Sequence, residues 1–554
     1  MPTIRVTVEG KTAELMSGAT LLEALRALLA PSRVGNVLCA LRGGVCMELS
    51  EPLTADCELT PITYRDEEGR RVYERTLRFL FLLSAKRLYP KLRIRMLNSV
   101  GHGLYIRALV KDLMHEDVEA IERDMRELVK QDVPFLKEIW SREDAIQYFQ
   151  KEGWHDEAGL MRYRPNEKIT MYRIGDFCEY FYGAMLPSTG YVSVFALKPH
   201  FPGVVLMWPE PDAPSVPAPY LPRTKFLRVF AESQEWCRIL GAQNAVDVNR
   251  MIRKGGIRDF IRVNEALQDR STAHIADQIA ARRARVIMVF GPSSSGKTTF
   301  AHRLAIHLRA LGLKPKLVSL DDFYRNLCDL PLEADGTPDR EHVDSLDVPL
   351  LTNCIEGLLG GQSVQMPRFD FKTATRFAKG YAMRLGPDEP IIFEGIHAMS
   401  DKITSGIPEQ LMFSVYVSAL GCINLDDHNR IRTTDVRLLR RIVRDIRLRN
   451  TSVKETIDMW PKVRLGEEKW IFPNQEKADV FFNTSLHYEL PVLKTIAYDL
   501  LLYKPQSEPD YLVAHRLLKT LHYFLPVDAR VREEIPPMSI LREFVGESPL
   551  FDAH

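Results

Sequence analysis

The sequence predicts a multidomain α/β protein whose C-terminal half is a parallel sheet flanked by helices. With 554 residues, the chain is long enough for three or four domains, each with its own core. A cluster of prolines between Trp208 and Thr224 favours an extended connector and marks a domain boundary. From Arg285 onward, short apolar runs alternate with amphipathic segments, which is typical of a parallel sheet with helical crossovers.

The composition is that of a folded protein without a strong charge bias. Hydrophobic residues make up 45% and charged residues 27%, and 74 Lys and Arg residues face 73 Asp and Glu residues. Any site for a polyanion must therefore be local. No apolar run approaches the roughly 20 residues of a membrane span, and the start MPTIRVTVEG lacks a secretory signal. We therefore expect a cytoplasmic protein with no membrane partner and with reduced thiols.

The first 66 residues show a strand, helix, strand order. Alternating apolar residues at 4–8 predict a half-buried strand, and Thr20 is a suitable N-cap for the helix that follows. Two more short strands are predicted at 37–41 and 59–64. With the phrase SGATLLEAL, this order resembles a TGS domain, the small β-grasp module found at the start of threonyl-tRNA synthetases.

The likeness to threonyl-tRNA synthetase continues over 67–210 into its second, editing-type domain, through SAKRLYP, HEDVEAIERDMRELVKQDVPF and LPSTG. That domain class holds a metal with two His on one helix and a Cys and a His further on. Here the helix RFLFLLSAKRLYP has no His, Cys178 remains, and Met185 stands where the second ligand belongs. One thiolate cannot build a zinc site. We expect a binding or structural role, with RNA, a regulatory ligand or another subunit as the partner, including a second copy in a homo-oligomer.

A phosphate-binding loop follows the apolar strand 286–290. The segment GPSSSGKT at 291–298 precedes a helix, which is the context that a Walker A loop requires. Its two glycines allow backbone N–H groups to point at phosphate oxygens. Lys297 suits the β- and γ-phosphates of ATP, and the Thr298 hydroxyl suits Mg²⁺. The predicted ATP-binding residues are Gly291, Ser293, Ser294, Ser295, Gly296, Lys297, Thr298 and Thr299.

The surroundings of the loop separate kinases from other nucleotide-binding proteins. No N-K-x-D guanine motif is present, and LLGGQ at 358–362 is followed by no Asp-Glu pair of the transporter type, so it indicates a turn before a strand. The segment LVSLDDFYRN places Asp321 at the C-terminal end of a strand, where α/β sheets bind their ligands. A carboxylate there can accept the proton of an attacking hydroxyl. A helix cap or a turn is the alternative role for Asp321.

Six segments resemble the uridine kinase and phosphoribulokinase branch of P-loop kinases over roughly 285–490: GPSSSGKTT, SLDDFY, EHVDSLD, QMPRFDF, IIFEGIHA and RLLRRIVRDIRLRN. The resemblance implies transfer of phosphate from ATP to the 5′-hydroxyl of a nucleoside, with Asp321 as the base. It also implies that Glu394 positions Mg²⁺ or its water. The implied substrate residues are Tyr324, Glu341, Phe369, Phe371 and Arg376, with core packing as the alternative for each aromatic.

The basic stretch 430–449 holds eight Arg and two Asp, and its apolar residues fall on one face of a helix. The resemblance implies a lid in which Arg441, Arg444 and Arg449 close on the transferring phosphate, since guanidinium groups form forked bonds with phosphate oxygens. A solvated helix face and a contact with nucleic acid are the alternatives. With Lys297 and Asp321, these arginines form the predicted catalytic set.

Three departures leave the nucleoside open. Ala374 stands where pyrimidine-specific members have a base-reading His, Glu341 replaces an Asp near the ribose, and Thr451 replaces a lid Arg. The nucleoside kinase is our first hypothesis. The second is an RNA-associated P-loop ATPase regulator that uses the synthetase-like half as its binding surface.

The domain boundaries follow from these assignments. We predict a TGS-like domain at 1–66, a synthetase-like domain at 67–210, and a proline-rich linker with a helical connector at 211–284. The P-loop kinase-like domain covers 285–500, and a C-terminal helix and tail, with no assigned chemistry, cover 501–554.

Overall fold

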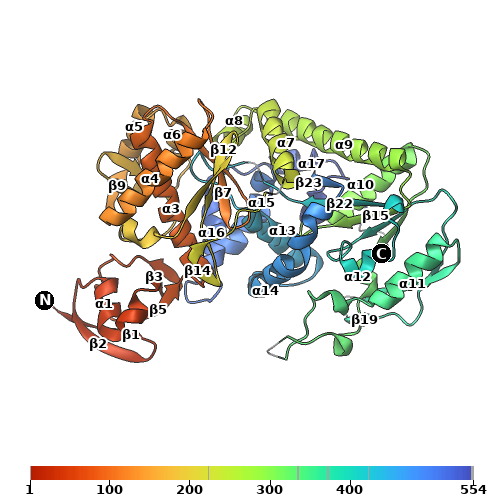
Figure 1. The fold of residues 1–554 in the computed structure, drawn as a ribbon, viewed down its shortest axis with the longest axis horizontal. Coiled ribbons are helices and arrows are strands. Elements are labelled where there is room, and N and C mark those ends of the chain that lie inside the picture. Colours follow the sequence, from red (N-terminus) through yellow and green to blue (C-terminus); the bar gives the residue numbers. More distant parts are fainter. Residues whose placement is uncertain (1, 223, 334–335, 371–372, 422, 551–554) are drawn as a thin grey trace.

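The computed structural model describes residues 2–222, 224–333, 336–370, 373–421 and 423–550. The chain forms an N-terminal, a middle and a C-terminal part. In Figure 1 the N-terminal part lies below the middle part at the left, and the C-terminal part extends to the right. The predicted multidomain α/β architecture is confirmed. Within the described ranges, no helix has both the length and the apolar character needed to cross a membrane.

The N-terminal part is a five-stranded sheet covered by one helix. Its strand order is β2 (Lys11–Met16), β1 (Thr3–Val8), β5 (Cys57–Thr63), β3 (Val37–Arg42) and β4 (Val45–Met47). Strands β1 and β5 are parallel, as in a β-grasp arrangement, and the other neighbours are antiparallel. Helix α1 (Leu21–Leu28) begins with a capping box, because the Thr20 hydroxyl accepts from the Glu23 N–H and Glu23 accepts from the Thr20 N–H. The predicted cap is confirmed. The short helix α2 (Pro31–Val34) follows.

The middle part consists of four helices and two antiparallel sheets. The helices are α3 (Glu67–Leu88), α4 (His115–Gln131), α5 (Arg142–Lys151) and α6 (His155–Met161). One sheet has the order β11 (Ala196–His200), β12 (Gly203–Met207), β7 (Gly103–Ala108), β6 (Ile94–Ser99), and the other has β10 (Phe177–Glu179), β9 (Lys168–Ile174), β8 (Leu136–Ser141). On α3, the side chains of Phe79, Phe81 and Ser84 are fully buried in the core. The helix face that lacks histidines is therefore filled by packing.

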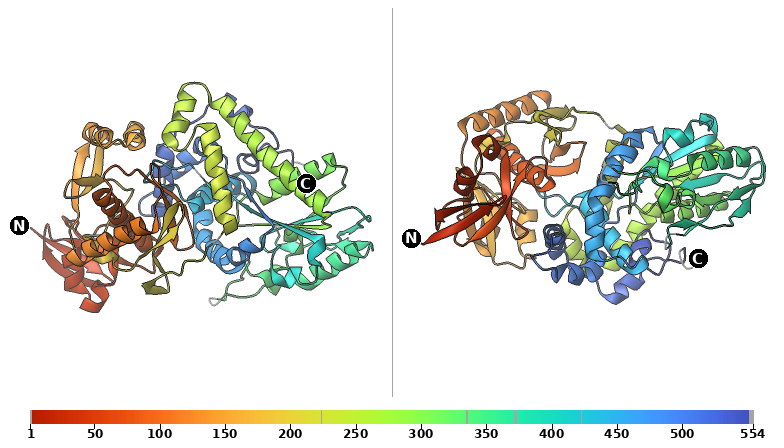
Figure 2. Two further views of the ribbon diagram at one scale, coloured as in Figure 1. Left: turned by 45° about the horizontal axis from the view of Figure 1, so that its top comes forward. Right: turned by 90° about the horizontal axis from the view of Figure 1, so that it is seen from below.

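The connector folds more tightly than an extended linker. Strands β13 (Pro209–Glu210) and β14 (Ala213–Pro217) pair with each other, so the first prolines form a hairpin. Proline tolerates this position because a two-stranded ribbon leaves edge N–H positions unused. The predicted helical segment follows as α7 (Thr224–Leu240), α8 (Ala245–Arg253) and α9 (Ile257–Arg282). Apolar residues of α9 share one core with the C-terminal sheet, so these helices pack on the C-terminal part (Figure 2).

The C-terminal part is built on the predicted parallel sheet. Its strand order is β16 (Lys316–Ser319), β21 (Ile391–Glu394), β15 (Val286–Phe290), β22 (Met412–Ser418), β23 (Val480–Asn483), with all four pairings parallel. Strand β15 is completely buried, as expected when helices cover both faces of a sheet. The main helices are α10 (Lys297–Ala310), α11 (Val348–Leu359), α13 (Thr433–Leu448), α14 (Val453–Gly466), α15 (Glu489–Leu502) and α16 (Tyr511–His522). Shorter elements include α12 (Asp401–Thr404), α17 (Ala529–Glu533), α18 (Arg542–Val545) and the ribbons β17 (Val364–Met366) with β20 (Tyr381–Met383) and β18 (Phe369–Asp370) with β19 (Thr375–Arg376).

A loop of the C-terminal part docks into the middle part. The Asn424 side chain donates to the carbonyl of Met96 at 2.7 Å, and the Met96 N–H donates to the carbonyl of Asp427 at 2.8 Å. Arg93 and Arg95 pair with the Asp427 carboxylate at 3.0 and 2.6 Å. The loop 424–432 therefore joins the two parts by hydrogen bonds and ion pairs, and we call it the docking loop.

The docking loop also buries a cluster of ionisable groups. Tyr180 donates to Asp426, and His428 bonds Glu179, with Glu157 at 3.7 Å from the same imidazole. Burial lowers the pKa of His428, but the carboxylates of Glu179 and Glu157 more than offset this and raise it to about 10. Burial raises the pKa of Asp426 to about 7. The cluster therefore binds protons more tightly in the folded chain than in the unfolded chain.

This proton binding predicts a loss of stability at high pH. The stabilisation from His428 is complete below the unfolded pKa near 6.5 and is lost as the pH rises towards about 10. Breaking a buried ion pair typically costs about 3 to 5 kcal/mol. We expect His428→Gln to lower the thermal midpoint at pH 6.5. Between pH 6.5 and 10, the thermal midpoint of this variant should decrease less than that of the wild type. The exposed His115 supplies the control variant His115→Gln. Parallel pH profiles for wild type and His428→Gln would contradict this assignment.

Candidate active site

The phosphate loop has the conformation that its glycines permit. Gly291 has φ +154°, and a Cβ there would lie 1.9 Å from the carbonyl oxygen of Val417. Gly296 has φ +84° and precedes the first residue of α10. Ser294 is left-handed at φ 57°, and the buried hydroxyls of Ser294 and Ser295 have no hydrogen-bond partner among the residues that the structure describes. Two orphaned hydroxyls in a loop at a helix N-terminus fit the oxygens of a bound phosphate.

Three predicted site residues, two catalytic and one for Mg²⁺, meet at the carboxyl ends of the central strands. Lys297 begins α10 and donates to the carbonyl of Pro292 at 3.0 Å. Glu394 ends β21 beside Ser319, its partner in the strand register, and accepts from the Ser319 hydroxyl at 2.8 Å. The same hydroxyl accepts from the N–H of Asp321 at 3.3 Å. The strand pairing thus places both carboxylates near the phosphate loop.

Burial changes the proton affinity of all three groups. It lowers the pKa of Lys297, which Glu394 and Asp321 partly oppose. It raises the pKa of Asp321, which Lys297, Arg449 and Arg444 oppose. It also raises the pKa of Glu394 to about 7, with the Asp321 carboxylate as the second cause. Glu394 is buried and Asp321 is half-buried, and neighbouring carboxylates of this kind suit a divalent cation.

The predicted lid arginines lie on α13 and at its end. Arg441 donates to the Ser293 hydroxyl of the phosphate loop at 2.9 Å. Arg444 pairs with Asp445 at 2.7 Å, and Arg449, the C-cap, lies 3.8 Å from the same carboxylate. Arg444 and burial lower the pKa of Arg449 to about 10. The amphipathic helix predicted for 430–449 is confirmed over Thr433–Leu448, and Asp445 holds the arginines together.

The predicted substrate residues gather beside Asp321. The rings of Tyr324 and Phe369 lie 5.8 Å apart. Arg376 donates to Asp347 at 3.1 Å and to the carbonyls of Phe323 and Tyr324, so its guanidinium also holds this loop in place. Phe371 lies outside the described residues.

Glu341 lies among charged groups of the same site. Burial raises its pKa to about 7, which the Arg441 guanidinium opposes and the carboxylate of Glu467 supports. A Cβ at Gly466 would lie 2.6 Å from the Cβ of Glu341, so the end of α14 fits closely over this residue.

The sequence reasoning missed His397, three residues after Glu394. Its imidazole is 2% exposed and lies near the backbone of Glu341. Burial lowers its pKa to about 4, so the ring is neutral near pH 7. A histidine inside the motif IIFEGIHA was the available signal.

Comparisons with known proteins agree with the geometry. Residues 286–489 match the phosphoribulokinase/uridine kinase family. The C-terminal part contains a domain of this family. It has the P-loop kinase fold, and we call it the kinase domain. Two solved structures are similar at low identity. A possible uridine kinase from Bacillus stearothermophilus has 19% identity, 36% coverage of this chain, 89% of that chain and a TM-score of 0.26. D-glycerate 3-kinase from Cryptococcus neoformans has 18% identity, 48% coverage of this chain, 89% of that chain and a TM-score of 0.22.

The N-terminal part of the chain is similar to threonine–tRNA ligases. The ligase of Carboxydothermus hydrogenoformans is 31% identical over 186 residues, which are 33% of this chain. The chain spans 29% of that ligase's length. In the middle part, Cys178 and Met185 are both buried, and the described residues contain no group of three His, Cys, Asp or Glu side chains arranged for a metal ion.

Two carboxylates already accept from the phosphate loop of the kinase domain. The Ser293 N–H donates to Glu467 at 3.1 Å. The Thr299 hydroxyl donates to Glu543 at 2.7 Å, and the Thr299 N–H donates to the same oxygen at 3.4 Å. Glu543 belongs to α18, beyond the residues matched by the family, and Ile540 of the same segment packs against Gly296. The C-terminal tail therefore contacts a loop more than two hundred residues earlier in the chain.

We expect Glu543→Gln to tighten ATP binding by about tenfold. The substitution removes a negative charge that would compete with phosphate oxygens for the Thr299 donors, and such charged hydrogen bonds contribute about 1.5 to 3 kcal/mol. The exposed Glu533 of α17 supplies the control Glu533→Gln. Calorimetric titration with ATP measures the difference. Unchanged or weaker ATP binding by Glu543→Gln would show that the tail does not compete with the nucleotide.

Proposed function

We propose that the chain transfers the γ-phosphate of ATP to the 5′-hydroxyl of a nucleoside. The observation that supports this most directly is Asp321, which is half-buried just after β16. It lies near Lys297, Arg449 and Arg444, the cations that oppose the rise of its pKa on burial. A carboxylate in this place is a base for an alcohol acceptor. A protein that only binds nucleotide as a switch needs no base for an alcohol acceptor.

Each group of the site has a distinct part in this reaction. Asp321 accepts the proton of the attacking hydroxyl, and its raised pKa moves it towards the pH at which a base works best. Lys297 and the loop N–H groups bind the phosphates, and Arg441, Arg444 and Arg449 stabilise the charge on the transferred group. Mg²⁺ held by Thr298 and Glu394 would neutralise phosphate charge.

The acceptor side offers flat apolar faces and hydrogen-bonding groups. The Tyr324 and Phe369 rings can stack on a nucleobase, which suits any base. Glu341 is the candidate for the ribose hydroxyls, and Arg376 for the base edge. Ala374 follows the undescribed residues 371–372 with φ 53° and contributes no polar group. These contacts favour a nucleoside without strong selection of one base.

The RNA-directed alternative rests on the ligase-like N-terminal part. In that case the kinase domain would be a nucleotide-dependent switch. Asp321 and the arginines gathered around it favour the kinase, because a switch needs no base for an alcohol acceptor. RNA, a regulatory ligand or a second copy of the chain remain the partners that we propose for the N-terminal half.

We expect Asp321→Asn to keep ATP binding while lowering phosphoryl transfer at least about 100-fold, the typical effect of losing a positioned general base. Lys297→Ala should weaken both ATP binding and turnover. The nearby exposed Asp329 supplies the control Asp329→Asn. The measurement is ADP release with a panel of nucleosides, together with ATP titration of each variant. Near-normal turnover by Asp321→Asn would remove Asp321 from the proposed role.

The same panel tests the acceptor. We expect several nucleosides to be phosphorylated, because stacking and ribose contacts provide most of the binding. Discrimination above about 10³-fold normally requires dedicated polar contacts with the base. A preference of that size for uridine or cytidine would contradict the role assigned to Ala374. Glycerate and sugars are tested as further acceptors. ADP release with one of them, but with no nucleoside, would show that the acceptor is not a nucleoside.

A further inference from the structure

A cavity of about 170 Å³ lies where all three parts of the chain meet, and we call it the junction cavity. Its walls come from the β-grasp hairpin at Gly44–Cys46, from α3, from the docking loop and from α16. It is more than five times the roughly 30 Å³ that one water molecule takes in the liquid, so it has room for a phosphate group. None of the predicted site residues lines it.

The walls of the junction cavity are strongly cationic. Seven cationic side chains line it: Arg71, Arg75, Arg78, Arg430, Arg432, Arg516 and Lys519. Its carboxylates are Glu68 and Asp435, and Glu67 and Glu74 pair with wall arginines from the edge. Seven positive charges against four negative charges leave three in excess. The whole chain has a formal charge of only +1, so this excess is local.

The excess falls on three particular side chains. Four of the seven cations have an ion pair in the walls: Arg71 with Glu67, Arg75 with Glu68, Arg432 with Glu74 and Arg516 with Asp435. No ion pair within 4.0 Å joins Arg78, Arg430 or Lys519 to a carboxylate in the described part of the chain. Arg78 instead lies over the Phe181 ring at 5.1 Å, and Arg430 donates to the Ser99 hydroxyl.

Unused donors accompany the excess charge. The Nε atoms of Arg78, Arg430 and Arg516 are buried without a hydrogen-bond partner among the described residues. Burial and neighbouring arginines lower the pKa of Arg78 to about 9 and that of Arg430 to about 10. Burial, with Arg75 and Arg164 next, lowers the pKa of Lys519. Buried guanidinium donors of this kind are expensive unless an anion accepts from them.

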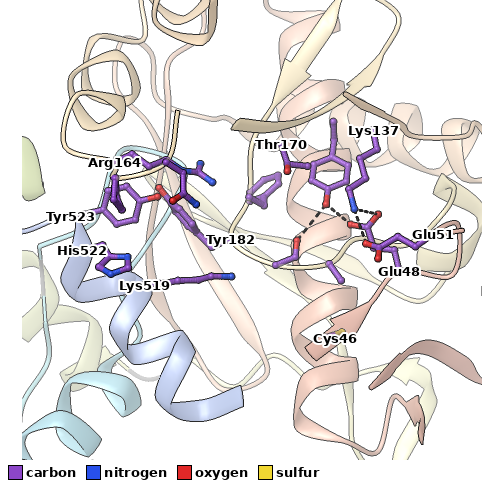
Figure 3. A pocket seen from close by; sticks show the side chains of 16 residues that line it. Cys46, Glu48, Glu51, Lys137, Arg164, Thr170, Tyr182, Lys519, His522 and Tyr523 are labelled. Carbon is purple, nitrogen blue, oxygen red and sulfur yellow. Dashed lines mark hydrogen bonds and ion pairs between the residues drawn. The ribbon is translucent and has the colours of Figure 1, made fainter. Parts of the chain in front are cut away.

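A second cavity of about 220 Å³ adjoins the junction cavity and shares Lys519, Tyr182 and Tyr523 with it (Figure 3). In Figure 3, Lys519 extends from α16 into the space between the two tyrosines and the Lys137–Glu48–Glu51 group. The aromatic rings and the polar Thr170 give this neighbour a mixed lining. It can hold the uncharged portion of a molecule whose anionic end lies in the junction cavity.

We propose that the junction cavity binds a small phosphate-bearing molecule, with the phosphate held by Arg78, Arg430 and Lys519. Arginine forks and a lysine match phosphate oxygens in geometry and in charge. A cavity of about 170 Å³ admits a small molecule or a single chain end and is too small for a nucleic acid duplex. Because its walls belong to three parts of the chain, the bound anion fixes the middle part against the kinase domain.

The test uses the full chain with Lys297→Ala, which weakens phosphate binding at the kinase loop. Pyrophosphate and inorganic phosphate are titrated by calorimetry into this chain and into the same chain with Arg78→Gln and Arg430→Gln. We expect one saturable site, weakened at least about tenfold by the double substitution. Arg123→Gln, at an exposed position on α4, is the matched control and should leave binding unchanged.

A second variant tests the proposal independently, in case the double substitution prevents folding. Lys519→Gln changes one side chain of α16 and should weaken pyrophosphate binding several-fold, with a smaller salt dependence. Pyrophosphate should also raise the thermal midpoint of the parent chain by more than that of either variant. Absence of saturable binding, or equal binding by the parent and both variants, would overturn the proposal. Binding of tRNA that depends on Arg78, without binding of pyrophosphate, would also overturn it in favour of RNA.

Discussion

Two buried arginines of α13 form ion pairs in the core, and the positions of the phosphate loop and the neighbouring helices depend on them. Arg437 is 2% exposed and Arg440 is fully buried. Arg437 pairs with Glu467 through both terminal nitrogens and donates to the carbonyl of Ser293, and Arg440 pairs with Glu489. Removing one partner of such a pair typically costs about 3 to 5 kcal/mol, because the other charge stays buried. The pairs therefore fix α13 against the phosphate loop, α14 and α15 at once.

The chemistry that sequence reasoning identified lies in contiguous motifs. Lys297 and Asp321 follow strands of the parallel sheet and Glu394 ends one. Parallel strands bring their carboxyl ends to one edge of a sheet, so local patterns predicted the site. Sequence analysis did not identify Glu467 and Glu543, because they lie 174 and 244 residues from their hydrogen-bond partners. Neither glutamate lies in a phosphate-binding pattern. The fold class, the β-grasp strands and α13 could be predicted for the same local reason, whereas the packing of α9 on the kinase sheet could not.

The middle part of this ligase-like region has aromatic residues on the helix face that the sequence analysis compared with a metal-binding helix. Phe79 and Phe81 of α3 are fully buried, and their burial stabilises the domain. What the middle part adds is an interface: Arg93 and Arg95 bind Asp427 of the docking loop, and that loop leads directly into α13. The sequence predicted an arginine-rich helix over 430–449 as one unit. The structure divides it, since Arg430 and Arg432 precede the helix and face the middle part, while Arg441 and Arg444 face the phosphate loop.

Two groups of arginines therefore lie at opposite ends of α13, one at the junction cavity and one at the phosphate loop. Asp435, in the first turn of α13, pairs with Arg71 and Arg516 at the junction cavity, and Asp445, in its last turn, gathers the arginines near Asp321. Between them, the buried pairs of Arg437 and Arg440 resist bending. Coupling between sites requires an element with two discrete positions that both sites bias. The ion pairs of Arg437 and Arg440 hold the middle of α13 to Glu467 and Glu489, and Glu467 also accepts from the Ser293 N–H of the phosphate loop. Coupling between the two ends would therefore require α13 to move as one body together with these partners.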